Sequence, residues 1–179
     1  MFELETPRLY LVETPLHVVE ARLKQDEFDV EVLIGGQARR VQFPPEWPGD
    51  AFGFFPGLAE HHHRHPEAEP SGGILCLIEK TGMVAVGNMG TKGPPDAAGT
   101  VDIGYGMNPS YQGHGYMTEA VQSFAAWLLG RSDVVRVTAD CLKTNTGSVR
   151  VLEKAGFVRS HEHYDDGEGG VLVFWELTL

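Results

Sequence analysis

The stretch that decides the fold is VDIGYGMNPSYQGHGYMTEAV, residues 101–121. It begins as an alternating strand that places apolar side chains on one face and Asp102 on the other. A loop with two glycines follows, and then apolar residues at helical spacing predict a helix over about 115–129. The first N–H groups of a helix have no internal partner and carry partial positive charge. Because Gly113 and Gly115 let the backbone approach a ligand closely, this pattern predicts a pyrophosphate-binding loop.

Two familiar phosphate-binding motifs do not fit this loop. A Walker loop needs a lysine directly after its last glycine, and none follows here. The pattern G-x-G-x-x-G ends on Pro109 when it starts at Gly104, and on Thr118 when it starts at Gly113. The glycines alone therefore leave an ordinary strand-to-helix turn as the alternative to a phosphate site.

The rest of the chain alternates between strand and helix patterns, which indicates an α/β protein. Helices are predicted from Pro15, over 115–129 and over 145–157. Residues 28–73 hold many aromatic residues and prolines, and we expect short helices and loops there. Strands are predicted over 6–12, 74–79, 83–89, 100–107 and 134–142, and on both sides of the turn 165–170.

Composition excludes several classes of function. The chain has 179 residues, enough for one domain with a real core, and its net charge is −11. Such an acidic protein is a poor nucleic-acid binder, and no run approaches the ~18 apolar residues of a membrane span. The first residues do not have the pattern of a signal peptide. Cys76 and Cys141 lie in apolar runs without metal-site spacing, so we expect buried reduced thiols and a cytoplasmic protein.

Three segments together resemble the GNAT acetyltransferase superfamily. The sequence QGHGYM, residues 112–117, resembles its coenzyme loop Q/R-x-x-G-x-G/A, and departs from it at Met117. NTGSVRVLEKAGF, residues 145–157, is similar to a later family segment, and TPRLYLV, residues 6–12, resembles the RimJ/RimL-like branch that acetylates ribosomal-protein N-termini. The resemblance implies a single GNAT-like domain over residues 1–179. Its mixed, mostly antiparallel sheet would be splayed at the acyl-CoA site and flanked by helices.

The resemblance also implies that acetyl-CoA is the cosubstrate, with no metal. The amides of residues 113–118 would hold its pyrophosphate, and the backbone of Gly106 and Met107 would pair with the pantetheine arm. Asn145 matches a family asparagine on that arm, and it equally suits a helix N-cap. The expected coenzyme-binding residues are Gly106, Met107, Gln112, Gly113, His114, Gly115, Tyr116, Met117, Thr118 and Asn145.

Acetyl transfer to an amine needs a proton acceptor and a donor for the departing thiolate. Asp102 is the first candidate base and Glu46 the second, although either carboxylate could serve only as a surface or ion-paired group. Leu152 stands where many relatives carry a tyrosine, so Ser148 is the candidate donor, with a helix-start role as the alternative. The remaining hydroxyl candidates are Tyr105, Tyr116 and Tyr164.

The resulting hypothesis is N-acetylation of a primary amine by direct attack on acetyl-CoA. An α-amine with a pKa of ~8 is about one-tenth neutral at pH 7, which favours a peptide or protein N-terminus or a small amine. The alternative is a non-catalytic acyl-CoA-binding regulatory module. A homodimer is compatible with the sequence. The run HHHRH, residues 61–65, is interpreted as a polar loop rather than a metal site, because consecutive side chains rarely converge on one ion.

Overall fold

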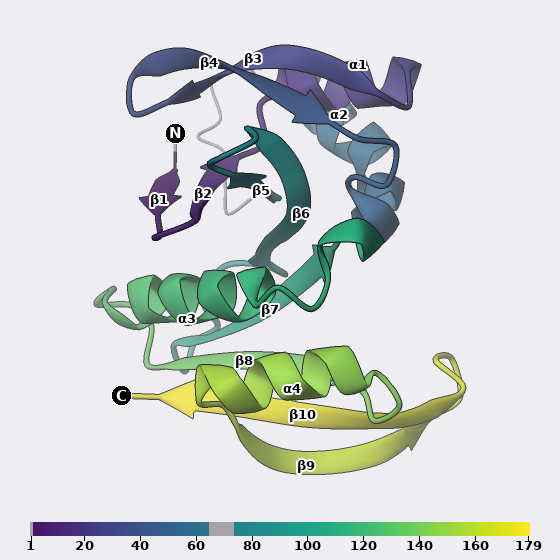
Figure 1. Cartoon of the computed structure of the whole chain (residues 1–179). Coiled ribbons are helices and arrows are strands. Elements are labelled where there is room, and N and C mark those ends of the chain that lie inside the picture. Colours follow the sequence, from purple (N-terminus) through teal and green to yellow (C-terminus); the bar gives the residue numbers. More distant parts are fainter. Residues whose placement is uncertain (1, 65–73) are drawn as a thin grey trace. The chain divides into compact units, whose positions relative to one another are not determined.

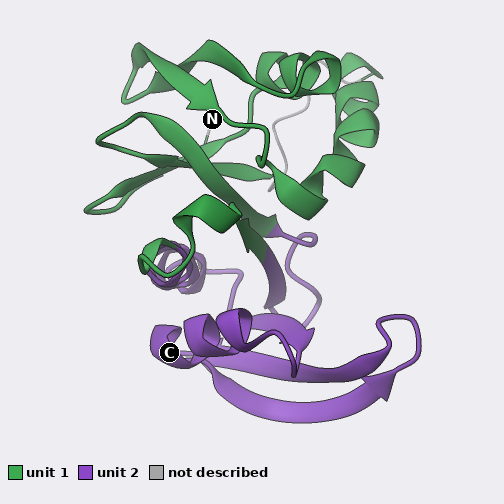
Figure 2. Cartoon of the chain, turned by 45° about the vertical axis from the view of Figure 1, so that its right-hand side comes forward, with its two compact units in different colours: residues 1–90, 105–116 green, residues 91–104, 117–179 purple. Residues whose placement is uncertain are grey.

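The computed structural model describes residues 2–64 and 74–179, and the chain divides into two units (Figure 2). Unit 1 consists of residues 1–90 and 105–116, and unit 2 of residues 91–104 and 117–179. Strand β7 (Thr100–Met107) and helix α3 (Tyr116–Leu129) each continue from one unit into the other. That residues 1–179 act as a single domain stays a prediction from the sequence.

The strands of unit 1 follow one another in the order β1-β2-β5-β6 (Figure 1). They are β1 (Glu3–Glu5), β2 (Leu9–Glu13), β5 (Leu75–Glu79) and β6 (Val84–Thr91), and consecutive neighbours in this order pair antiparallel. The strands predicted over 74–79 and 83–89 are therefore confirmed. The strand predicted over 6–12 begins only at Leu9, because residues 6–8 form the turn after β1, which was not anticipated.

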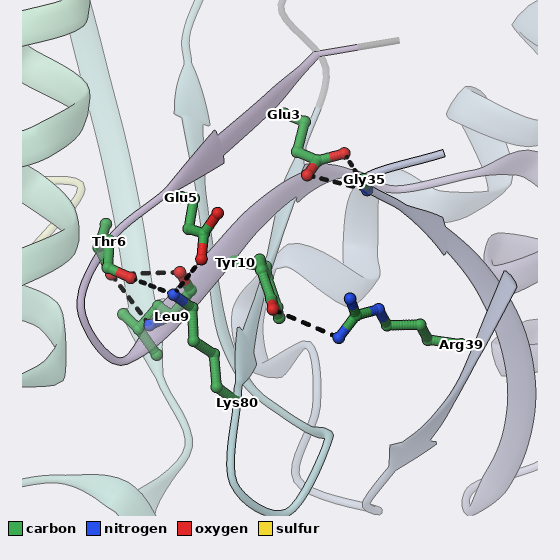
Figure 3. A network of polar contacts seen from close by, with 8 residues as sticks. All are labelled: Glu3, Glu5, Thr6, Leu9, Tyr10, Gly35, Arg39 and Lys80. Atoms are coloured by element: carbon green, nitrogen blue, oxygen red, sulfur yellow. Dashed lines mark hydrogen bonds and ion pairs between the residues drawn. The ribbon is translucent and has the colours of Figure 1, made fainter. Parts of the chain in front are cut away.

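A polar network fixes the turn between β1 and β2 (Figure 3). The Thr6 N–H donates to the Leu9 carbonyl at 2.9 Å, and the Leu9 N–H returns a bond to the Thr6 hydroxyl at 2.9 Å. The Lys80 ammonium binds the Thr6 carbonyl and pairs with Glu5 at 2.6 Å. Because these bonds close the turn from both sides, residues 7 and 8 between them project from a well-defined backbone.

The prediction of only short helices and loops over residues 28–73 is wrong in its first part. Residues 28–43 form an antiparallel hairpin of β3 (Phe28–Ile34) and β4 (Gln37–Phe43), and Gln42 of β4 also pairs in parallel with Val84. Gly35 and Gly36 have φ of 60° and 73°, the left-handed conformation of a two-residue hairpin turn.

Helices α1 (Leu16–Lys24) and α2 (Phe55–Arg64), with the 3-10 segment η1 (Gly49–Phe54), complete the core of unit 1. An aromatic chain connects these elements: Phe43 lies against Phe28 and Trp47, with ring centroids 4.9 and 4.7 Å apart, and Trp47 meets Phe55 at 5.5 Å. All four of these rings are buried. Phe54, in contrast, is 70% exposed.

Unit 2 contains the strands β7, β8 (Arg136–Leu142), β10 (Gly170–Thr178) and β9 (Val158–Asp165), in that order. Strand β10 pairs antiparallel with β8 and β9, whereas β7 pairs with β8 in parallel over Thr100–Asp102. This parallel register covers three of the eight residues of β7, which agrees with a sheet that opens after Asp102. The mixed, mostly antiparallel sheet is thereby confirmed.

The two faces of this sheet differ in character. Val137, Ala139 and Cys141 of β8 are buried, as are Val173 and Trp175 of β10, whereas the residues between them stay half-buried. Helix α3 and helix α4 (Thr146–Ala155) contribute further buried residues, and Gln122 of α3 donates to the Lys154 carbonyl of α4 at 2.9 Å. Both helices lie within the ranges predicted for them, and Gly156 at φ 90° caps the end of α4.

Candidate active site

The glycine loop of unit 1 follows the 3-10 turn η2 (Pro109–Tyr111) and leads into α3. Gly113 and Gly115 both have φ of 80°, a conformation that glycine adopts without strain. Residues 112–115 are exposed, and no hydrogen bond within the described ranges uses the backbone N–H of residues 113–115. These donors are thus open to a ligand at the start of a 14-residue helix, where the dipole favours an anion.

Side chains from inside and outside the loop hold its backbone. Gln112 Nε2 donates to the Met107 carbonyl at 3.1 Å, so its side chain folds back on the end of β7. Arg8 Nη1 donates to the His114 carbonyl at 2.9 Å, and its guanidinium lies over the Tyr116 ring at 4.6 Å. The sequence did not single out Arg8, because 106 residues separate it from His114 and no local pattern links the two.

Glu46 binds η2, the turn directly before the glycine loop. Its carboxylate accepts the backbone N–H of Ser110 at 3.2 Å and also the hydroxyl of Ser110. The next residue, Trp47, donates from its indole to the Gly87 carbonyl of β6 at 3.1 Å. Within unit 1, Glu46 is therefore a half-buried residue that orders the approach to η2, in addition to being a candidate base.

The end of β7 runs close against β6 in unit 1. A Cβ on Gly87 would lie 2.5 Å from the Gly106 carbonyl oxygen and 3.2 Å from the Met107 Cα. The register of β5 and β6 skips Val86, whose carbonyl accepts the Asn108 N–H at 2.9 Å. The backbone of Gly106 and Met107, which the resemblance assigns to the pantetheine arm, is thus held from the β6 side.

Asp102 of unit 2 is an ion-paired carboxylate. Its oxygens pair with Lys92 Nζ at 2.8 Å and accept the Thr138 hydroxyl at 3.0 Å, and Lys92 also pairs with Asp140. Burial by itself would lower the pKa of Lys92, but the hydrogen bonds and charges of the two aspartates outweigh it and raise that pKa. The ion-paired alternative for Asp102 is therefore observed, and its role as a base stays a prediction.

A pocket of about 410 Å³ lies on the half-buried face of the unit 2 sheet. Asp102, Thr138 and Asp140 line it from β7 and β8. Another part of its lining is aromatic: His161 stacks on Phe174 with centroids 4.3 Å apart and planes at 3°. Sequence analysis missed this aromatic pair, although the alternation of β9 and β10 could have placed both rings on one face.

Asn145 and Ser148 lie together at the start of α4. Asn145 Oδ1 accepts the Ser148 backbone N–H at 3.1 Å, which makes Asn145 the N-cap of α4. The Ser148 side chain is half-buried, and Leu152 one turn later is fully buried. The cap is one of the two predicted roles of Asn145, and contact with the coenzyme stays a prediction, as does the role of Ser148. Met117 and Thr118 belong to the first turn of α3 in unit 2.

The remaining candidates are dispersed. Tyr164 is 64% exposed, whereas Tyr105 and Tyr116 are half-buried. The described part of the histidine run, His61–Arg64, ends helix α2 instead of forming the predicted loop, and His65 lies outside the described residues. In residues 2–64 and 74–179 no cluster of histidine, cysteine or acidic side chains has the arrangement of a metal site. Among the helices of these residues, none combines the length and apolar character that a membrane crossing requires.

Comparison with known proteins agrees with this architecture of strand, glycine loop and helix. A family model for the acetyltransferase (GNAT) domain matches residues 27–158. The N-acetyltransferase YjdG of Bacillus subtilis, itself uncharacterized, is 32% identical over 163 residues, which cover 90% of this chain and 93% of YjdG. These matches define an acyltransferase. The chain belongs to the GNAT acetyltransferase family.

Solved structures share the fold. A GNAT-family acetyltransferase from Bacillus anthracis superposes with a TM-score of 0.67 at 18% identity, covering 99% of this chain and 98% of that one. The ribosomal-protein α-N-acetyltransferase RimL in complex with coenzyme A gives a TM-score of 0.69 at 15% identity, with the same coverage of 99% and 98%. At these identities the likeness establishes the fold, in which this chain resembles RimL.

Proposed function

We propose that this chain transfers the acetyl group of acetyl-CoA to a primary amine by direct attack. The observation that carries the proposal is the glycine loop, whose exposed N–H groups precede α3 and whose two glycines adopt φ of 80°. Such a backbone cradle suits a diphosphate. The solved coenzyme A complex of RimL, which has the same fold, supports coenzyme A as the ligand.

In the proposed reaction the neutral amine nitrogen attacks the thioester carbonyl carbon, and the carbon–sulfur bond then breaks. Asp102 would take the amine proton, and the Ser148 hydroxyl would donate to the departing thiolate sulfur. Lys92 pairs with Asp102 at 2.8 Å, so the amine would have to share or displace this ion pair to reach the carboxylate. Glu46 is the second candidate base.

The pocket of unit 2 is the proposed place for the acceptor, since Asp102 lines it. A peptide or protein N-terminus, or another small α-amine, demands least of the base, because its pKa of ~8 leaves about one-tenth of it neutral at pH 7. We also place the protein in the cytoplasm. Cys76 and Cys141 are both free and buried, and burial raises the pKa of the Cys76 thiol, which keeps it unreactive.

A screen that follows coenzyme A release from acetyl-CoA tests this function. Peptides with free N-termini, the same peptides blocked by acetylation, lysine side-chain analogues and polyamines would be offered in parallel. We expect steady thiol release with free α-amines and none with the blocked peptides. If the chain binds coenzyme A but no amine promotes release, the non-catalytic acyl-CoA-binding module is the correct alternative.

A further inference from the structure

We propose that Arg8 is a positioning residue for coenzyme binding. Although it lies outside the glycine loop, its side chain holds the loop backbone in the orientation that binds the diphosphate. This inference rests on the proposed function, since it concerns how the same loop binds acetyl-CoA. Arg8 lies between β1 and β2, outside every segment that the coenzyme motif covers.

Two contacts, to His114 and Tyr116, and a close approach to Gly115 between them place the Arg8 guanidinium beside the end of the loop. Nη1 donates to the His114 carbonyl at 2.9 Å. A Cβ built on Gly115 would lie 3.5 Å from Nη2, and the guanidinium carbon stands 4.6 Å from the centre of the Tyr116 ring. A single exposed side chain thus contacts the part of the loop where the backbone turns into α3.

The hydrogen bond to His114 determines where the next N–H points. In a trans peptide the carbonyl and the following N–H lie on opposite sides of the bond. Because Arg8 holds the His114 carbonyl, the N–H of Gly115 is directed to the opposite side, away from the guanidinium. Glycine permits many backbone conformations, so without this bond the 114–115 peptide could rotate and turn its carbonyl oxygen towards the phosphate.

Charge supports the same role. Residues 109–118 contain no lysine or arginine, and the whole chain carries a net charge of −11. A cation at the carbonyl end of the 114–115 peptide polarises the peptide, which strengthens the bond that its N–H donates to an anion. Arg8 therefore both orients the donor and offsets the acidity of the chain next to the loop.

The turn that carries Arg8 is built to hold it in place. Thr6 and Leu9 bond to each other on either side of Arg8, and Lys80 binds the Thr6 carbonyl (Figure 3). The Lys80 N–H also donates to the carbonyl of Arg8 itself at 3.0 Å. The backbone around Arg8 is thus fixed by Thr6 after β1, Leu9 of β2 and Lys80 after β5, and the Arg8 side chain extends from it to the loop.

The test combines Arg8→Ala with two acetyl donors. Acetyl-CoA carries the diphosphate, whereas acetyl-pantetheine lacks it. We expect the KM for acetyl-CoA and the Kd for coenzyme A to rise about tenfold to a hundredfold, the range for a hydrogen bond to a charged group. We expect kcat at saturating acetyl-CoA to stay within twofold of wild type, and kcat/KM for acetyl-pantetheine to stay unchanged. A general weakening of the fold would affect both donors alike, so this discrimination isolates the positioning role.

Arg40→Ala is the matched control. Arg40 of β4 is an exposed arginine of the same unit, paired with Asp29 at 3.2 Å, and its loss changes the net charge equally. Its coenzyme affinity should match wild type. If Arg8→Ala does not fold, Arg8→Lys replaces it. Lysine keeps the charge but lacks the planar guanidinium that can cover the Tyr116 ring and bond to the His114 carbonyl at the same time. A several-fold rise in KM for acetyl-CoA alone is then expected.

The possible outcomes separate the two proposals. Wild-type protein that fails to bind coenzyme A overturns the proposed function. Wild-type protein that binds coenzyme A, with an Arg8 variant of equal affinity, overturns the role of Arg8 and leaves the function standing. Equal losses with both donors also overturn the role, because they show an effect that is independent of the diphosphate.

Discussion

The close approach of β6 to the end of β7 gives a sharp prediction for Gly87→Ala. The new Cβ would stand 2.5 Å from the Gly106 carbonyl oxygen and 3.2 Å from the Met107 Cα, both of which are backbone atoms. A flexible side chain could move aside, but here one of the two backbone segments has to shift. The shift would also disturb the carbonyl of Gly87, which accepts the Trp47 indole N–H at 3.1 Å.

The expected loss of stability follows from these two effects. Overpacking by one methyl group typically costs about 1–3 kcal/mol, and a weakened buried hydrogen bond adds about 1 kcal/mol. Gly87→Ala should therefore lower the free energy of unfolding by about 2–4 kcal/mol, which for a chain of this length lowers Tm by about 5–15 °C. Affinity for coenzyme A should fall as well, since the shifted backbone is the edge assigned to the pantetheine arm.

Urea unfolding followed by tryptophan fluorescence measures this change, and Gly57→Ala is the control. Gly57 lies in α2, is exposed, and has no atom within 4 Å of the position where a Cβ would be added. The same substitution there should raise stability by about 0.5–1 kcal/mol, because alanine favours a helix. A Gly87→Ala chain within about 0.5 kcal/mol of wild type would refute the reasoning, since that is the range of a neutral surface change.

The remaining predictions concern the proposed chemistry. Gly115→Val, at φ 80°, should weaken coenzyme A binding at least tenfold by calorimetry, and unchanged affinity in a folded chain would remove the loop from the site. Ser148→Ala keeps the backbone N–H that the Asn145 side chain caps, so stability should hold while turnover falls tenfold or more; turnover within twofold of wild type would end the donor role. Asp102→Asn should lower kcat at pH 7 by about 10²–10⁴, with partial recovery as pH rises and the amine deprotonates itself, and a pH–rate profile identical to wild type would shift attention to Glu46. The pKa of Lys92 is raised above its ordinary value of 10.5, so protonated Lys92 contributes stability that is fully present below pH 10.5 and is lost as pH rises through the higher folded pKa. Asp102→Asn removes one cause of the raised pKa, and it should therefore reduce the loss of unfolding free energy at alkaline pH.

Much of the fold was predictable because local patterns and tertiary packing agree. The alternation around Asp102 and the apolar spacing of α3 each describe one element that the structure confirms. The hairpin of residues 28–43 was missed because charged residues and nearby prolines obscured it. Its signal was nevertheless present, since two alternating segments flank Gly35 and Gly36, a typical two-residue hairpin turn.

The candidate site was predictable only where it depends on local backbone conformation. The positions of Gly113 and Gly115 could be recognised in the sequence, because a backbone turn with positive φ, here 80° at both residues, usually requires glycine. Arg8 could not be found in this way, since its contact with His114 spans 106 residues. The partners of Asp102 were also hidden, because Lys92 follows a different strand and Thr138 comes from β8, and only the folded sheet brings them to one carboxylate.

The charges around Asp102 bear on which kind of amine the proposed reaction would favour. The negative charges at the pocket are Asp102, Asp140 and Glu176. The positive charges are Arg136 and the neighbouring Lys92. Each carboxylate already has a cationic partner, as Glu176 pairs with Arg136 at 3.3 Å. In the proposed reaction, an acceptor that stays protonated would therefore compete with Lys92 for Asp102, whereas a neutral amine would donate an N–H to a remaining lone pair of the carboxylate. Losing a proton at pH 7 costs an α-amine of pKa ~8 about 1.4 kcal/mol and a lysine of pKa ~10.4 about 4.6 kcal/mol. The ion pair observed at Asp102 thus adds a structural reason to expect an α-amine as the acceptor.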